Sequence, residues 1–207
     1  MTDKIVDTHQ HLWDLSRFSL PWLAGLDALD RSFTIDDYAA AVDGLGVVRS
    51  IYMEVDVADD QQQDEVGYVT RLCADPGNCM AAAVVSGRPA AEGFATWVRS
   101  LEDNPVVKGV RQVLHVPQAT RGTCLQTDFV HGIRLLGEAG LRFDVCLRPS
   151  ELADAEQLAA ACPDTLLVLD HCGIPNPNIV AGVAEPDGGP MSHTADGWRR
   201  NMAALSE

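Results

Sequence analysis

Short runs of apolar residues recur along the chain and alternate with segments of mixed polarity. The runs are rich in Val and Ile and nearly uninterrupted, a pattern typical of parallel strands that are covered on both faces. We predict strands at residues 4–7, 47–57, 80–86, 106–114, 141–147 and 165–170.

The segments between these strands place apolar residues on one side of a helix. Thr34 and Asp37 resemble a capping box, with Asp where Glu or Gln is usual. Residues 173–190, rich in Pro, Gly and Asn, are predicted to form a loop long enough to serve a function. We predict helices from residue 35 to Gly44 or Gly46, at residues 61–74, 94–101 and 127–139, from Pro149 to Cys162, and at residues 198–205.

This alternation predicts an α/β fold with a parallel sheet, either doubly wound or closed into a barrel. Periodicity alone does not choose between the two. No G-x-G-x-x-G or Walker pattern follows a strand, which argues against a nucleotide site. We find no internal repeat or linker, so residues 1–207 are predicted to form a single domain.

Charge and composition exclude some partners. Acidic residues outnumber basic ones 30 to 15, and the Lys and Arg residues do not cluster, so nucleic acid is not an expected partner. No apolar stretch is long enough to span a membrane, and the N-terminus has no signal peptide pattern. The six cysteines include no C-x-x-C pair and sit mostly among apolar neighbours. We therefore predict a cytoplasmic protein with buried thiols and no disulfide framework.

Two of the six histidines, His9 and His11, lie where the first predicted strand ends. Side chains alternate along a strand, so both imidazoles point to one face and Gln10 to the other. The carboxyl ends of parallel strands carry the active site in α/β folds. The pair is suited to one metal ion, commonly Zn²⁺, with an open position for water. A hydrogen-bonded pair in a polar turn is the alternative.

A third histidine, His171, follows the sixth predicted strand and is expected at the same edge. The alternative is an ordinary loop histidine. Asp170 beside it would orient an imidazole or cap the following turn. His131, in a predicted helix, and His193, in the loop region, are taken as non-catalytic.

Further candidates lie at other strand ends. Arg111 and His115 share a face of the fourth strand, where a guanidinium would hold a carboxylate or polarise a carbonyl. Glu54 and Asp56 share a face of the second strand and would ligate metal or act as general base. Arg148, after the fifth strand, is another candidate anion contact. The alternative for Arg111 is an ordinary surface arginine. The alternative for Glu54 and Asp56 is a pair of solvated loop acids.

Three motifs together support a family resemblance. D-x-H-x-H-L-W-D follows the first strand, K-G-V-R-Q-V-L-H lies at the fourth and L-V-L-D-H-C-G at the sixth. Together they resemble the amidohydrolase-related (amidohydrolase-2) family, along nearly the whole chain. The most similar branch is that of the sugar-lactone and dicarboxylate-lactone hydrolases, including fuconolactonase-like proteins. The motifs are fairly specific for the family and poor at identifying the substrate.

The resemblance implies a TIM (β/α)8-type barrel and a hydrolase that opens a lactone ring with an activated water. His9, His11 and His171 match the family histidines and would polarise the lactone carbonyl. Some relatives bind a divalent metal and some lactonases work without one. The expected cofactor is therefore Zn²⁺ or Mn²⁺ on these histidines and Glu54, or none.

The substrate implied is a small lactone or carboxylate. Arg111 matches a substrate-contacting position of the family, and Arg148 and His115 are the other expected substrate contacts. The K-G-V-R-Q-V-L-H stretch favours the lactonase branch. A metal-dependent decarboxylase of the same family and a catalytically inactive barrel fragment are the alternatives.

The chain departs from the family pattern at its carboxyl end. The family barrel has eight strands, and its eighth carries an Asp that serves as general base. We count six βα units here, so the last two strands and that Asp are expected to be absent, leaving Glu54 and Asp56 as acids near the site. Two exposed sheet edges would follow, which a homodimer or domain swapping would cover.

Overall fold

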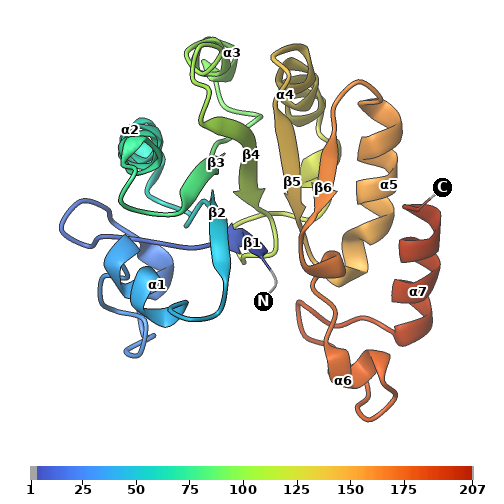
Figure 1. Ribbon diagram of the computed structural model, residues 1–207. Helices are drawn as coiled ribbons and strands as arrows, with labels where there is room; N and C mark the ends of the chain where they lie inside the picture. The colour runs from blue at the N-terminus through green and yellow to red at the C-terminus, as the bar shows by residue number, and fades with distance from the viewer. Residues whose placement is uncertain (1–3, 207) are drawn as a thin grey trace. The chain divides into compact units, whose positions relative to one another are not determined.

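The computed structural model describes residues 4–206 of the chain, and in them strands and helices alternate as the sequence predicts (Figure 1). The strands follow one another in the hydrogen-bonded order β1-β2-β3-β4-β5-β6. Their bounds are β1 Ile5–Gln10, β2 Val47–Met53, β3 Met80–Ser86, β4 Val107–Val113, β5 Arg142–Cys146 and β6 Leu167–Leu169. The helices are α1 Ile35–Ala41, α2 Gln62–Ala74, α3 Phe94–Arg99, α4 Thr127–Glu138, α5 Leu152–Ala161, α6 Pro177–Val180 and α7 Ala195–Ala204.

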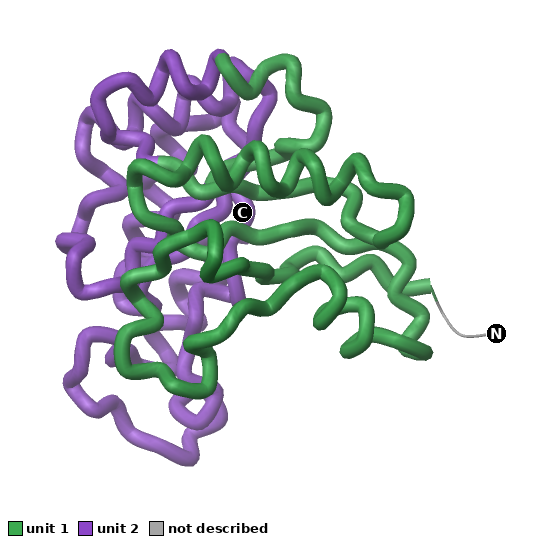
Figure 2. The backbone as a smooth tube through the Cα atoms, turned by 90° about the vertical axis from the view of Figure 1, so that its left-hand side faces the viewer, with its two compact units in different colours: residues 1–87, 100–110 green, residues 88–99, 111–207 purple. Residues whose placement is uncertain are grey.

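The chain divides into two compact units (Figure 2). Unit 1 comprises residues 1–87 and 100–110 and holds β1 to β3 and the start of β4. Unit 2 comprises residues 88–99 and 111–207 and holds the rest of β4, β5 and β6. Pairing is parallel between β1 and β2, between β2 and β3, and between β5 and β6. The prediction of one domain over residues 1–207 stays a prediction.

In unit 1 the segment between β1 and α1 packs on the segment that follows β2. An aromatic and aliphatic cluster fixes this contact, with the Trp13 and Trp22 rings 5.7 Å apart in a T-shaped arrangement. The Trp22 indole donates a hydrogen bond of 2.7 Å to the carbonyl of Val55. Two loops that follow neighbouring strands are therefore held together. The buried members of the cluster are Trp13, Phe18, Leu20, Leu23, Val55 and Val57.

In unit 2 helix α4 packs against β5 through an aromatic pair. The Phe129 and Phe143 rings lie 5.6 Å apart, edge to face, and both side chains are fully buried. Gly132, on the same face of α4, lies so close to Pro89 that an added Cβ would sit 2.8 Å from the Pro89 Cα. The periodicity of α4 in the sequence thus marks the face that forms the core of this unit.

The predicted capping box is confirmed. The Thr34 side chain accepts from the Asp37 N–H, and the Asp37 carboxylate accepts from the Thr34 N–H at 2.7 Å. Asp therefore replaces Glu at this position without loss of either bond.

Several element boundaries differ from the prediction. β1 continues to Gln10 and includes His9, whereas β2 ends at Met53, and Asp56, three residues further on, takes a left-handed conformation (φ 50°). The last helix begins three residues earlier than predicted, since Thr194 caps it by accepting from the Gly197 N–H at 3.0 Å.

The predicted loop at residues 173–190 is only partly irregular. It contains the short helix α6, which Asn176 caps and which has Pro177 in its first turn. No helix within residues 4–206 combines the length and apolarity needed to cross a membrane.

The Gly132 contact yields a stability prediction. Gly132→Ala should lower the free energy of unfolding by about 1–3 kcal/mol, because the new methyl group would come within 2.8 Å of backbone atoms of Pro89, which would have to shift. Urea unfolding followed by circular dichroism measures this loss.

The matched control is Gly67→Ala in α2, where the new Cβ would meet only the flexible end of Arg71 at 3.4 Å. This exchange should raise the free energy of unfolding by up to about 1 kcal/mol, which is the difference in helix propensity between Ala and Gly. Equal effects of the two exchanges would contradict the described packing of α4.

Candidate active site

His9 and His11 lie side by side at the carboxyl end of β1. Their ring centroids are 4.9 Å apart, with the rings nearly perpendicular at 78°. Two imidazoles bound through nitrogen to one tetrahedral ion at ~2.0–2.1 Å place their centroids about 5 Å apart. The spacing therefore fits two ligands of one metal ion.

The position of the ring hydrogen on His11 follows from its partners. His11 Nδ1 lies 3.0 Å from the carbonyl oxygen of Met53 and 3.1 Å from that of Glu54. Carbonyl oxygens only accept, so Nδ1 carries the hydrogen and the neutral ring has its lone pair on Nε2. This is the tautomer that binds a metal through Nε2 or accepts a proton there.

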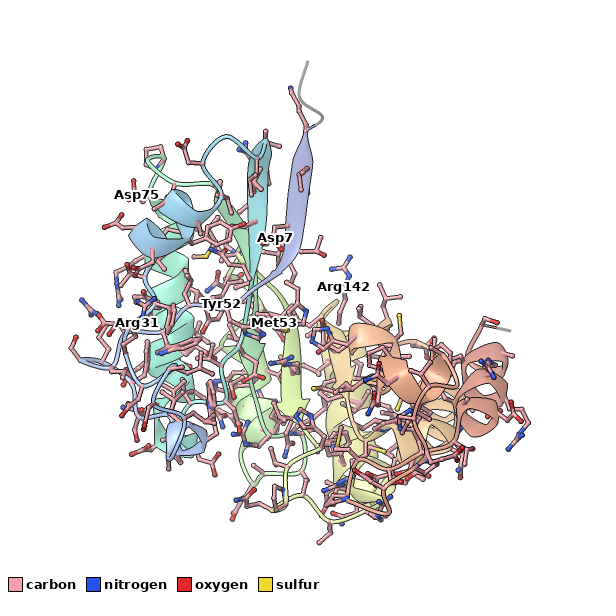
Figure 3. The ribbon with its side chains drawn as sticks, turned by 90° about the horizontal axis from the view of Figure 1, so that it is seen from below. Asp7, Arg31, Tyr52, Met53, Asp75 and Arg142 are labelled. Carbon is pink, nitrogen blue, oxygen red and sulfur yellow. The ribbon has the colours of Figure 1, made fainter. Side chains whose placement is uncertain are left out.

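Asp7 and Tyr38 fix the backbone on the amino-terminal side of the pair. One oxygen of the Asp7 carboxylate accepts from the His9 N–H at 3.1 Å, and the other accepts from the Tyr38 hydroxyl at 2.8 Å. Figure 3 labels Asp7 on β1 and Tyr52 and Met53 on β2. Burial raises the pKa of Tyr38 well above its ordinary value, and the Asp7 carboxylate adds to the shift. Tyr38 therefore stays a hydrogen donor at all physiological pH values.

Two buried carboxyl groups stabilise the segments that follow β2 and β3. Glu65 of α2 accepts from the Tyr52 hydroxyl at 2.9 Å and from the Ser86 N–H at 2.7 Å, and Glu54 accepts from the Asp56 N–H. Both glutamates are fully buried. Burial and the nearby Glu54 carboxylate raise the pKa of Glu65 to about 8.

A second group of polar side chains lies in unit 2. The Arg111 guanidinium donates to the Asp170 carboxylate at 2.9 Å, and both side chains are almost completely buried. Arg111 Nη1 also lies 4.0 Å from Cys146 Sγ, which is 3.5 Å from His115 Nδ1. The sequence prediction brings Arg111 and His115 together on one strand face, and the structure links them through this sulfur.

His171 follows β6 on a backbone of unusual conformation. His171, Cys172, Gly173 and Ile174 all have φ between 50° and 77°, so four consecutive residues are left-handed. This costs about 1–2 kcal/mol for each residue other than Gly. The Trp198 indole donates to the Cys172 carbonyl at 2.9 Å and helps to hold the turn. Strain of this kind concentrates at functional sites, and the His171 side chain is exposed.

Arg148 and Glu54 have partners that the sequence does not predict. Arg148 donates to the Glu151 carboxylate and to the carbonyls of Val116 and Ala119 at 2.6–2.8 Å, which anchors the loop after β4. Glu54 supports His11 through its backbone carbonyl. The substrate role of Arg148 and the ligand role of Glu54 stay predictions. Within residues 4–206 no three His, Cys, Asp or Glu side chains are arranged to hold a metal ion.

His193 is a structural residue of the region that follows β6. It is buried, its Nδ1 donates to the Met191 carbonyl at 3.1 Å, and its Nε2 accepts from the Asn176 N–H at 3.3 Å. Both ring nitrogens therefore bind backbone and tie α6 to the segment before α7.

Comparison with known proteins decides the family. The sequence profile of the family described as Amidohydrolase matches residues 6–206. The chain belongs to the amidohydrolase family. The predicted TIM-barrel type of α/β fold and the coarse assignment as a hydrolase enzyme are thereby confirmed.

Solved structures of other amidohydrolases share this fold. Amidohydrolase 2 from Bifidobacterium longum subsp. infantis is 28 % identical, with a TM-score of 0.68, and the match covers 99 % of this chain and 69 % of that one. A zinc-bound amidohydrolase from Burkholderia multivorans is 24 % identical, with a TM-score of 0.76, and the match covers 99 % of this chain and 66 % of that one. The chain thus spans about two thirds of the length of these structures.

Two more distant structures show the fold alone. One is a probable 2-pyrone-4,6-dicarboxylic acid hydrolase from Acinetobacter baumannii with bound citric acid, 13 % identical over 97 % of this chain and 77 % of that one, with a TM-score of 0.65. The other is a manganese-bound 5-carboxyvanillate decarboxylase from Novosphingobium aromaticivorans. It is 11 % identical over 82 % of this chain and 66 % of that one, with a TM-score of 0.56.

Sequence reasoning missed two residues of this amidohydrolase that support the candidate site. Glu65 lies within a predicted helix, and a buried carboxylate there has no local signal except its place on the apolar face beside Val66 and Val69. For Cys146 the sequence predicts only a buried thiol, although the residue lies two positions before Arg148 at a strand end.

Glu65 gives the amidohydrolase a characteristic pH dependence of stability. A carboxyl group whose pKa is higher in the folded than in the unfolded state keeps its proton on folding, so stability falls as pH rises between the two values. We expect the unfolding free energy of the metal-free protein to fall between pH 4.5 and 8, by up to about 1.4 kcal/mol per pH unit.

Glu65→Gln should remove this slope, because the amide does not titrate. Urea unfolding at several pH values, with a chelator present, measures the slope in each variant. The control is Glu102→Gln, which changes an exposed carboxylate and should keep the wild-type slope. A wild-type slope in Glu65→Gln would show that Glu65 is already ionised in the folded protein.

Proposed function

We propose that the protein hydrolyses the ester bond of a small lactone that carries a carboxylate or hydroxyl groups. The observation that carries this proposal is the pair His9 and His11 at the end of β1, with the His11 hydrogen fixed on Nδ1. A histidine so fixed presents a basic nitrogen, which the activation of water requires.

Ring opening needs an activated water, a polarised carbonyl and an acid for the departing alkoxide. Water adds to the carbonyl carbon, the ring C–O bond breaks, and the alkoxide oxygen takes a proton. His11 Nε2 supplies a lone pair that accepts a proton from water when no ion is bound. His171, exposed on its left-handed turn, is the second imidazole assigned to proton transfer or carbonyl polarisation.

The donor set at β1 also fits a divalent metal. His9 and His11 would hold Zn²⁺ or Mn²⁺, because their rings have the spacing of two ligands and His11 has the required tautomer. A bound ion would act there as a Lewis acid and lower the pKa of a bound water. The zinc and manganese in the related structures support this assignment.

Arg111 is the residue proposed to bind the substrate carboxylate. Its ion pair with Asp170 fixes the guanidinium in a buried position, so no rotamer freedom is lost when an anion binds. The dicarboxylate in the name of one structural relative is consistent with an anionic substrate.

The experiment is hydrolysis of a panel of lactones followed by proton release in a pH-stat. The panel contains sugar-derived 1,4-lactones and 2-pyrone-4,6-dicarboxylate, each assayed with added Zn²⁺, with added Mn²⁺ and with chelator. His9→Ala and His171→Ala should each lower kcat/KM at least about 100-fold, since they remove groups that contact water or carbonyl.

His131→Ala is the matched control, because His131 is an exposed residue of α4 and should leave the rate unchanged. Full activity in His9→Ala and His171→Ala would disprove the site assignment. Release of CO₂ from an aromatic carboxylic acid, with no lactone turnover, would instead identify a decarboxylase.

A further inference from the structure

A surface pocket of unit 1 lies between the segment that follows β1 and one face of helix α2. Its volume is about 280 Å³. Residues three and four apart on a helix share a face, which is how α2 contributes most of the lining. All lining residues belong to unit 1, and none is a residue of the candidate active site. They are Arg17 and Phe18 of the segment, and Gln63, Asp64, Gly67, Tyr68 and Arg71 of the helix.

The two sides of the pocket are held together by contacts of their own. The Gln61 side chain accepts from the Ser19 N–H at 2.7 Å and donates to the Arg17 carbonyl at 3.2 Å, which ties the segment to the start of α2. The buried Phe18 ring packs on the Tyr68 ring, with centroids 5.4 Å apart in a T-shaped arrangement. The pocket is therefore formed before a ligand binds, which lowers the ordering cost of binding.

Two guanidinium groups meet at this pocket from different elements. The Arg17 Cζ lies 5.9 Å from the centroid of the Tyr68 ring, and Arg71 Nη1 lies beside Gly67, 3.4 Å from where a Cβ would be. Burial raises the pKa of Tyr68, and both arginines oppose this rise. Both positive charges therefore act at the same tyrosine.

The two arginines differ in their partners. Arg17 donates through Nε to the Asp14 carboxylate at 3.1 Å, which balances part of its charge. Arg71 forms no ion pair with any carboxylate of the part of the chain that the structure describes. In a chain of formal charge −15, an arginine in a pocket without a carboxylate partner is suited to an anion from outside.

Asp64 restricts which anion the pocket accepts. Its carboxylate lines the same pocket, and an ionised carboxylate only accepts hydrogen bonds. It would repel a dianion such as phosphate, and it would accept from a hydroxyl group of a ligand. Gly67 leaves space in the middle of the helix face, at a cost of about 1 kcal/mol relative to Ala.

We propose that this pocket binds a small hydroxycarboxylate. The ligand carboxylate lies between Arg17 and Arg71, and one ligand hydroxyl donates to Asp64. The assignment rests on residues of unit 1 outside the candidate active site and does not depend on the proposed function.

The experiment is a ¹H–¹⁵N NMR titration of the ¹⁵N-labelled whole chain with D-gluconate at constant ionic strength and pH 7.5. The signals followed are the Gly67 and Tyr68 amides and the Arg71 Nε–H. We expect saturable shifts with a Kd of about 1 mM, as suits a small ligand at an exposed site. Hexanoate, which has no hydroxyl group, should bind about fivefold more weakly, and inorganic phosphate should also bind more weakly than gluconate.

Three variants test the assigned contacts. Arg71→Gln should weaken gluconate binding at least about tenfold. Asp64→Ala should abolish the preference for gluconate over hexanoate. Gly67→Ala should weaken gluconate binding although it raises the free energy of unfolding, so that loss of binding there is not a loss of folding.

The matched control is Arg99→Gln, which removes the same charge from an exposed position of α3 outside the pocket and should leave the affinity unchanged. Shifts that stay linear with gluconate concentration, tighter binding of phosphate than of gluconate, or wild-type affinity in Arg71→Gln would each overturn the proposal. The wild-type titration decides even where a variant does not fold. Lactone turnover is not measured, so failure of the proposed function leaves the result unaffected.

Discussion

A neutral imidazole has one hydrogen, so the partner at Nδ1 decides which chemistry remains at Nε2. The carbonyls of Met53 and Glu54 fix this choice for His11, and both belong to the end of β2. The site thus depends on the parallel pairing of β1 with β2, which brings those carbonyls beside the histidine. The backbone of one strand orients the functional side chain of its neighbour.

The ends of β2 and β3 are held in turn by a buried carboxyl group. Glu65 accepts from the Tyr52 hydroxyl and from the Ser86 N–H, and it is fully buried. A carboxyl group in such a place is costly unless its oxygens are hydrogen-bonded. The Trp13 and Trp22 cluster adds apolar packing between the segment after β1 and the segment after β2. Polar and apolar contacts therefore fix the loop backbone around His11 together.

The positions of the strands along the chain and the residues at strand ends could be predicted from the sequence, because apolar runs and the H-x-H spacing are local signals, whereas the barrel type of the sheet came only from the family resemblance. The partners of those residues could not, since they depend on contacts distant in sequence. Arg111 with Asp170, Cys146 with His115, and Glu65 with Ser86 are separated by 21 to 59 residues. The sequence does not predict the left-handed turn at His171 either, because Cys172 and Ile174 are of types that rarely adopt that conformation.

Our central proposal is that His9 and His11 can bind one divalent metal ion through Nε2. The most direct test is anomalous diffraction at the zinc absorption edge from crystals of the protein grown with Zn²⁺. We predict one strong peak at about 2.0–2.1 Å from the Nε2 atoms of both histidines, with His11 Nδ1 still on the carbonyls of Met53 and Glu54. No peak near β1, or a zinc ion bound through His11 Nδ1, would contradict the claim.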